Sequence, residues 1–182
     1  MRSVVLQMGV SLDGYVALPD GDLDWGLPPE DEAVIAWKMD SIRRVGTHIM
    51  GRLTYEAMAA TWPSSNEVYA APMNDIPKVV FSRSLSSADW PDSRIARGDL
   101  AEEIDVLRHE PGGDIMVHGG ATFVQALSQQ RLIDEYRLII RAVALGDGLQ
   151  LFKDLARPLP LSLASAMTYP DGTAIHVYRP RP

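Results

Sequence analysis

The chain has 182 residues, no cysteine and a formal net charge of −7 at pH 7. The length suits a single domain, residues 1–182, with its own hydrophobic core. The missing cysteine excludes disulfides, thiolate catalysis and cysteine zinc sites, and the acidic balance argues against nucleic acid as a main partner. No apolar run is long enough to span a membrane, and no signal-peptide pattern precedes the first expected strand, so we expect a cytoplasmic protein.

The predicted elements alternate between strand and helix before the chain finishes in strands. In chain order they are a strand at 3–10, a helix at 30–44, a strand at 47–50, a helix from 54, strands at 78–82 and 94–96, a helix at 99–110, a strand at 115–118, a helix after 120, and strands at 134–143, 161–169 and 173–179. The last two strands form a hairpin around Pro170-Asp171-Gly172. This order predicts the α/β class, with a mostly parallel sheet and an antiparallel C-terminal hairpin.

Three local features complete this prediction. Residues 62–77 are rich in Ser, Asn and Pro, so we expect a loop there. Thr54 can cap the helix that follows the strand at 47–50. Asp99 stands three residues before Glu102, which is the spacing of a capping box at the start of the helix at 99–110.

Residues 114–127 form the most informative stretch of the chain. A short apolar run ends in Gly119-Gly120, and an amphipathic helix begins at once. Backbone N–H groups at such a helix start are unpaired and lie at the positive end of the helix dipole, so the turn can hold a phosphate. Glycines let a ligand approach the backbone closely. A plain turn would use the same residues, so this motif needs support from other elements.

Two more predicted strands end in residues suited to an anion. Gly51 and Arg52 follow the strand at 47–50, and Ser82 and Arg83 close the strand at 78–82. Arginine is a planar, permanently charged donor that suits phosphate, although an isolated surface arginine would look the same. Ligands of open α/β sheets bind beyond the carboxyl ends of the strands, so the three strand ends together predict one elongated anionic ligand.

Five motifs in this order resemble the dihydrofolate reductase superfamily, and within it the reductase domain of bacterial riboflavin biosynthesis. They are S-L-D-G at 11–14, G-R-L-T-Y-E at 51–56, V-V-F-S-R at 79–83, H-G-G-A at 118–121 and A-L-G-D-G-L-Q-L-F at 144–152. The resemblance implies a three-layer α/β/α fold and a homodimer. It implies an NADPH-dependent reductase that passes hydride to a small pyrimidine- or pterin-like heterocycle, similar to 5-amino-6-(5-phosphoribosylamino)uracil reductase.

The resemblance also implies which residues hold NADPH. Met8 and Gly9 would lie beside the nicotinamide, and Ser82 and Arg83 would take the adenosine side, where an arginine on the 2′-phosphate favours NADPH over NADH. The residues implied for the pyrophosphate and adenosine phosphate are Gly51, Arg52, Thr54, Gly119, Gly120, Ala121 and Thr122. His118 could touch the cofactor or could be a half-buried strand residue.

The catalytic acid stays open at this level. Dihydrofolate reductases carry a carboxylate early in the first helix, and Glu30 overlays on that region, but an acidic first turn that complements the helix dipole would look the same. Asp24 and Asp40 have no better claim. Asp13 belongs, with Gly14, to the loop that closes over the cofactor in such enzymes, and is the second catalytic candidate.

Substrate contacts are assigned to Trp25 and Asp147, although an aromatic residue can be core and a Gly-Asp-Gly turn can be structural. The histidines lack metal-ligand spacing, so no metal is expected. Two alternatives to the small-molecule reductase remain. One is a dihydrofolate reductase proper, and the other is a nucleotide-binding protein that has lost catalysis.

Overall fold

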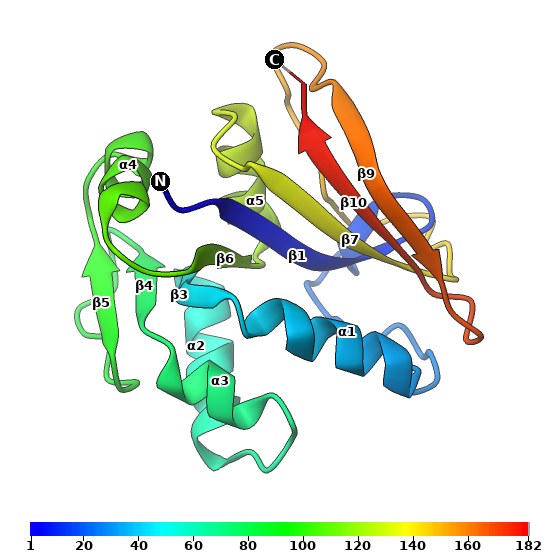
Figure 1. The fold of residues 1–182 in the computed structure, drawn as a ribbon, viewed down its shortest axis with the longest axis horizontal. Coiled ribbons are helices and arrows are strands. Elements are labelled where there is room, and N and C mark those ends of the chain that lie inside the picture. Colours follow the sequence, from blue (N-terminus) through cyan, green and yellow to red (C-terminus); the bar gives the residue numbers. More distant parts are fainter. Residues whose placement is uncertain (182) are drawn as a thin grey trace.

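The computed structural model describes residues 1–181, and an eight-stranded sheet forms its centre (Figure 1). The strands in sheet order are β5 (Ser93–Ala96), β4 (Lys78–Phe81), β3 (Val45–Gly51), β6 (Asp114–His118), β1 (Val4–Ser11), β7 (Glu135–Arg141), β10 (Ala174–Pro180) and β9 (Leu161–Thr168). A separate small sheet pairs β2 (Tyr15–Ala17) with β8 (Leu149–Gln150). The helices are α1 (Glu32–Ile42), α2 (Arg52–Thr61), α3 (Ala70–Asp75), α4 (Leu100–His109) and α5 (Ala121–Gln129), with a 3-10 turn η1 (Trp62–Ser64).

The predicted α/β architecture is confirmed. In sheet order, every neighbouring pair from β5 through β4, β3, β6 and β1 to β7 is parallel. β10 then pairs antiparallel with both β7 and β9. The final hairpin turns at Gly172, whose φ of +83° favours glycine. Buried parallel strands read as continuous apolar runs because both faces are covered, and the start of β1 has this character.

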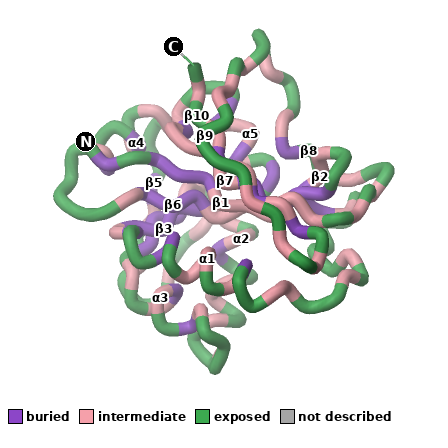
Figure 2. Tube along the Cα trace, turned by 45° about the vertical axis from the view of Figure 1, so that its right-hand side comes forward, coloured by how far each residue is buried: buried purple, intermediate pink, exposed green. Residues whose placement is uncertain are grey.

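Helices cover both faces of the sheet, which gives three layers (Figure 1). On one face, α4 and α5 pack through fully buried residues such as Ile104 and Leu127. On the other face, α1, α2 and α3 contribute Ile42, Tyr55 and Met73 to a second cluster. Figure 2 shows β1, β3 and β6 buried over much of their length, while β9 is largely exposed. The carboxyl ends of the central strands are therefore held on a rigid, well-packed base.

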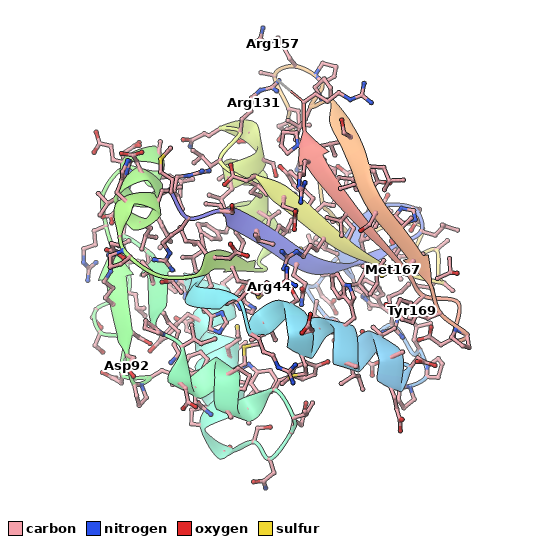
Figure 3. All side chains as sticks on the ribbon, in the orientation of Figure 1. Arg44, Asp92, Arg131, Arg157, Met167 and Tyr169 are labelled. Carbon is pink, nitrogen blue, oxygen red and sulfur yellow. The ribbon has the colours of Figure 1, made fainter. Side chains whose placement is uncertain are left out.

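A smaller cluster attaches α1 to the C-terminal hairpin. Val34 of α1 is fully buried against Ile139 and Ile175, and Met167 and Tyr169 pack around them. Figure 3 labels these last two side chains near the end of β9 that approaches α1. This contact fixes the position of α1, and with it the loop that leads into the helix.

The prediction of a loop at residues 62–77 is wrong, because this segment contains η1 and α3. Asn74 holds it in place. The side-chain amide donates to the backbone oxygens of Trp62 and Ala70 at 2.9 Å each, and its Oδ1 accepts from Trp90 Nε1 at 2.8 Å. Met73 is buried beneath it. Since these contacts come from tertiary packing, the polar composition of the segment gave no sign of them.

Helix starts differ from prediction at two places. Asp31 Oδ1 accepts from the amide of Ala33, so α1 begins at Glu32 and leaves Glu30 outside the helix. Thr54 does not cap α2, because the helix already begins at Arg52 with Gly51 at the N-cap position. At α4 the predicted cap by Asp99 is confirmed. Among residues 1–181, no helix is both long and apolar enough to cross a membrane.

Candidate functional site

The carboxyl ends of β4, β3 and β6 lie next to one another because these strands are adjacent and parallel. α2 begins directly after β3, and α5 begins directly after β6 with two glycines between. Neither helix has a side-chain cap, since the N-cap positions are Gly51 and Gly120. Two uncapped helix N-termini therefore open at one edge of the sheet, and their free backbone N–H groups can bind an elongated anion such as a diphosphate.

Glycine is required at the turn before α5. Gly120 has φ +61° and ψ 116°, and Gly119 has φ +22°. A Cβ atom at Gly120 would lie 3.1 Å from Thr54 Oγ1, and one at Gly119 would lie 3.4 Å from Met8 Cε. The first turn of α2 thus packs directly against Gly120, where a side chain would fill the space between the two helix N-termini, whereas a side chain at Gly119 would meet Met8 of β1.

The predicted arginine at α2 is engaged with its own helix. Arg52 Nη1 donates to both carboxylate oxygens of Glu56 at 2.9 Å, and this pair is solvent-exposed. Such a surface pair is weak, so a ligand phosphate can compete for the guanidinium.

The loop after β4 is built around Ser82. Its Oγ accepts from the amides of Ser84 and Leu85, at 3.2 and 3.0 Å, so the hydroxyl closes the turn. Arg97, which follows β5, donates to the backbone oxygens of Arg83 and Leu85. The Arg83 side chain is exposed and makes no hydrogen bond or ion pair within residues 1–181. Two arginines therefore meet at this corner, although only Arg83 lies in a recognisable sequence motif.

A pocket of about 640 Å³ opens beside the Gly-Gly turn. The predicted site residues that line it are Met8, Gly9, Trp25, Glu30, Thr54, His118 and Gly119. The predicted residues along the adjoining edge, outside the pocket lining, are Gly51, Arg52, Ser82, Arg83, Gly120, Ala121 and Thr122. Pocket and edge together can accommodate a ligand with a phosphate part and a ring part.

Asp13 and Asp147 lie outside this pocket and hold loops in place. The Asp13 carboxylate accepts from Ser11 Oγ at 2.6 Å and from the amides of Leu145 and Gly146 at 3.1 and 2.8 Å. These hydrogen bonds, with that from Ser11 the strongest, lower the pKa of Asp13 to about 2. Asp147 is exposed and accepts from the amide of Gly148 at 2.8 Å. Neither carboxylate faces the space where a substrate would bind.

Glu30 lines the pocket but is committed to two cations. Its oxygens lie 2.6 and 2.5 Å from Lys38 Nζ, and Oε1 lies 3.1 Å from Arg141 Nη1. The three side chains are only 15 to 20% exposed. Glu30 is thus neither the solvated helix end nor a free carboxylate. Lys38 and Arg141 belong to no motif. The only feature of the sequence that points to them is that each is a single charged residue within an apolar run.

Two histidines form a pair at the pocket wall, where His118 is half-buried in the lining and His48 is fully buried behind it. His118 Nε2 lies 2.8 Å from His48 Nδ1, and His48 Nε2 lies 3.2 Å from the backbone oxygen of Pro72. Burial lowers the pKa of His48 to about 4, with a smaller contribution from the charge of Lys78. Burial, with the neighbouring His48, holds the pKa of His118 well below its usual value. Both rings are therefore neutral at pH 7.

The pocket also contains polar atoms that lack partners. Within residues 1–181, Gln7 Oε1 and Trp25 Nε1 are buried and make no hydrogen bond, and both residues line the pocket. Buried polar groups are nearly always paired, so these atoms indicate positions where a ligand or water supplies the partner. Gln7 was not among the predicted site residues. The only sign of it in the sequence is one polar residue inside the apolar run V-V-L-Q-M.

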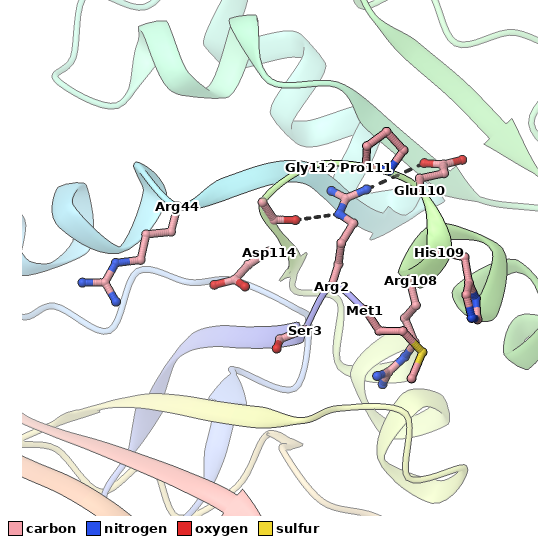
Figure 4. A pocket seen from close by; sticks show the side chains of 11 residues that line it. Met1, Arg2, Ser3, Arg44, Arg108, His109, Glu110, Pro111, Gly112 and Asp114 are labelled. Atoms are coloured by element: carbon pink, nitrogen blue, oxygen red, sulfur yellow. Dashed lines mark hydrogen bonds and ion pairs between the residues drawn. The ribbon is translucent and has the colours of Figure 1, made fainter.

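A second pocket, of about 620 Å³, lies at the other end of the parallel strands, where β1, β3 and β6 begin (Figure 4). Two of the arginines that line it are already paired with other groups of the protein. Arg2 donates to the oxygen of Gly113 and to Thr47 Oγ1, both at 2.6 Å, and Arg108 pairs with Asp134 at 2.8 Å. Within residues 1–181, no group of three or more His, Cys, Asp or Glu side chains is arranged to hold a metal. The pocket beside the Gly-Gly turn is thus the better candidate site.

Comparison with known proteins gives one family. A sequence model of the RibD C-terminal domain matches residues 2–175. Two proteins of uncharacterised function from Bacillus subtilis (strain 168) are similar over nearly their whole length. YwjB is 31% identical over 184 residues, 98% of each chain, and YyaP is 27% identical over 182 residues, 97% of this chain and 94% of YyaP.

Solved structures agree with this fold. A protein from Shewanella sp. PV-4, provisionally assigned to riboflavin biosynthesis, superposes with a TM-score of 0.79 at 24% identity, and each chain is fully covered. The deaminase/reductase of Thermotoga maritima gives a TM-score of 0.68 at 18% identity, with 99% of this chain and 57% of that one covered. Dihydrofolate reductase from Enterococcus faecalis, complexed with NADP(H), gives 0.66 at 14% identity, covering 99% of this chain and 97% of that one. The dihydrofolate-reductase-like fold is confirmed.

Proposed function

Because this chain belongs to the RibD C-terminal domain family, we propose that it is an NADPH-dependent reductase that transfers hydride to a small pyrimidine- or pterin-like heterocycle. One observation supports this most directly. The uncapped N-termini of α2 and α5 open together at the sheet edge, beside a pocket large enough for a nicotinamide and a small ring. A diphosphate at the helix ends and a ring in the pocket match the two parts of a dinucleotide.

The residues present fit NADPH along its whole length. Gly51 and Gly120 leave the helix N-termini open to the pyrophosphate. Arg83, supported by Arg97, would receive the 2′-phosphate at the corner after β4 and β5. Nothing lies within 4 Å of the position that a Cβ atom would take at Gly9, which leaves room beside β1 for the nicotinamide ring.

NADPH would supply the hydride, and the protein would position the reactants and exclude water. The pocket is suited to this role because much of its lining is apolar, from residues such as Leu27 and Met58. Trp25 Nε1 offers a hydrogen-bond donor and Gln7 Oε1 an acceptor for the substrate ring. Two predicted acid candidates line the pocket, and neither is a buried, unpaired carboxylate of the dihydrofolate reductase kind: Glu30 is held by Lys38 and Arg141, and Asp24 is exposed and accepts from the amide of Gly26.

A nucleotide-binding protein without catalysis is the second candidate. The glycine turns and arginines would bind the cofactor in either case, so binding and turnover have to be measured separately. A thermal-melt titration with NADPH, NADH and ATP should give the largest rise in melting temperature with NADPH. No shift with either nicotinamide cofactor would refute the reductase proposal.

The 2′-phosphate contact can be tested in the same assay. The double variant Arg83→Ala/Arg97→Ala should lose the preference for NADPH over NADH while still binding both. Arg157→Ala, an exposed arginine far along the chain, is the control. NADPH oxidation in the presence of aminopyrimidine and pterin compounds then separates the enzyme from the binding protein. Tight NADPH binding without oxidation of the cofactor across such a screen would favour the second candidate.

A further inference from the structure

The contact between buried His48 and half-buried His118 fixes which atoms donate and which accept. The backbone oxygen of Pro72 can only accept, so His48 Nε2, 3.2 Å away, carries the proton. In a neutral ring, His48 Nδ1 is then an acceptor, and His118 Nε2, 2.8 Å away, must donate to it. This order of donors and acceptors also determines the state of the remaining ring nitrogen, His118 Nδ1. His118 Nδ1 has no proton and no hydrogen-bond partner within residues 1–181, so it is an acceptor in a pocket-lining residue.

The neutral state that this reasoning requires follows from burial. His48 is fully buried, and the cationic form of either ring would be poorly solvated and would face the other ring. The ring centroids are 4.5 Å apart with an angle of 77° between the planes, so one ring edge points at the other. This edge-on contact also holds the orientation of the His118 ring.

A second acceptor lies next to His118. β1 and β6 are parallel, with Leu6 opposite Val117, so Gln7 and His118 occupy the next position on neighbouring strands. Side chains at matched positions of adjacent strands lie on the same face of a sheet. Gln7 Oε1 is buried without a partner, and both residues line the pocket. The two residues that carry these acceptors are therefore neighbours on this wall of the pocket.

We propose that the pocket selects its ligand through an uncharged amino or amide N–H group, which donates to His118 Nδ1 and Gln7 Oε1, and that His48 is the positioning residue that sets this polarity. The inference deepens the proposed function and rests on it only for the identity of the ligand. The required group occurs both on the carboxamide of a nicotinamide and on an amino-substituted heterocycle. Acceptors alone would reject a ring that offers only carbonyl oxygens there.

The polarity can be measured without any ligand. Nitrogen-15 NMR of the imidazole rings distinguishes a protonated from an unprotonated ring nitrogen. In the full chain at pH 7, both His48 and His118 should carry the proton on Nε2, with Nδ1 unprotonated. His48→Phe should remove this constraint, so that His118 shows averaged tautomers, whereas the exposed His109→Phe should leave the His118 signal unchanged. A proton on His118 Nδ1 in the unsubstituted chain would overturn the inference.

Two ligand pairs then test the selection and separate its sources. 2-Aminopyrimidine is compared with 2-methylpyrimidine, both uncharged at pH 7, and NADPH with its 3-acetylpyridine analogue, because each second member replaces one amino group by methyl. The amino member of at least one pair should bind about tenfold or more tightly, and His118→Leu should abolish the difference. The pair that shows the preference identifies the source of the N–H group.

The outcomes separate the two proposals. If NADPH binds but neither pair is discriminated, the acceptor inference fails and the reductase proposal stands. If 2-aminopyrimidine is preferred but NADPH does not bind, the acceptor inference stands and the reductase proposal fails. If neither amino-bearing probe binds, the acceptor inference is refuted.

Discussion

Acid should destabilise this protein through His48, at a pH where most globular proteins are still stable. The folded state keeps His48 neutral down to a pKa of about 4, whereas the unfolded chain takes up a proton at about 6.5. The unfolded state therefore binds more protons between these values, and stability falls as the pH is lowered through this window. At pH 5, about 1.5 units below the unfolded-state pKa, His48 alone lowers the free energy of unfolding by about 2 kcal/mol.

Urea unfolding at about pH 7.5, 6 and 5 measures this directly. His118 changes stability in the same direction, since its pKa is also lowered by burial. His48→Gln should be less stable at neutral pH but should lose about 2 kcal/mol less than the unsubstituted chain between pH 7.5 and 5. His109→Gln, at an exposed site, should keep the full loss. Equal losses in the His48 variant and the unsubstituted chain would show that His48 is not a buried neutral group.

Three further substitutions test other parts of the structure. Gly120→Val should lower the free energy of unfolding by about 1–3 kcal/mol because of the positive φ, and it should also abolish NADPH binding. Gly146→Val introduces similar strain in open space and should bind NADPH normally. Equal NADPH binding by both variants would refute the placement of the pyrophosphate. Asn74→Ala should cost about 1–3 kcal/mol in urea unfolding, because its partners stay buried, while the exposed Asn66→Ala should cost almost nothing. Glu30→Gln should lower stability by about 1–3 kcal/mol by leaving two cations unpaired; an unchanged unfolding curve would contradict these ion pairs.

Interactions between residues close in the sequence were enough to predict most of the fold. Apolar runs gave the strands, and the Gly-Gly turn gave the start of α5, because strand burial and positive φ depend on residues close in sequence. Asp99 likewise caps α4 through amides two and three residues away. The meeting of β3, β4 and β6 at one edge also followed, because parallel strands bring their carboxyl ends together.

The polar interior of the pocket was decided by tertiary structure alone. His48 and His118 are 70 residues apart, and Glu30 and Arg141 are 111 residues apart. Their contacts depend on strand register and on where α1 docks, which are set by packing of the whole core. Sequence by itself therefore determined where the proposed phosphate-binding edge lies, because glycines and the helix start after them are local features. Only the tertiary structure paired Glu30 with its cations and placed His118 beside Gln7, because these contacts join segments that are distant in the chain.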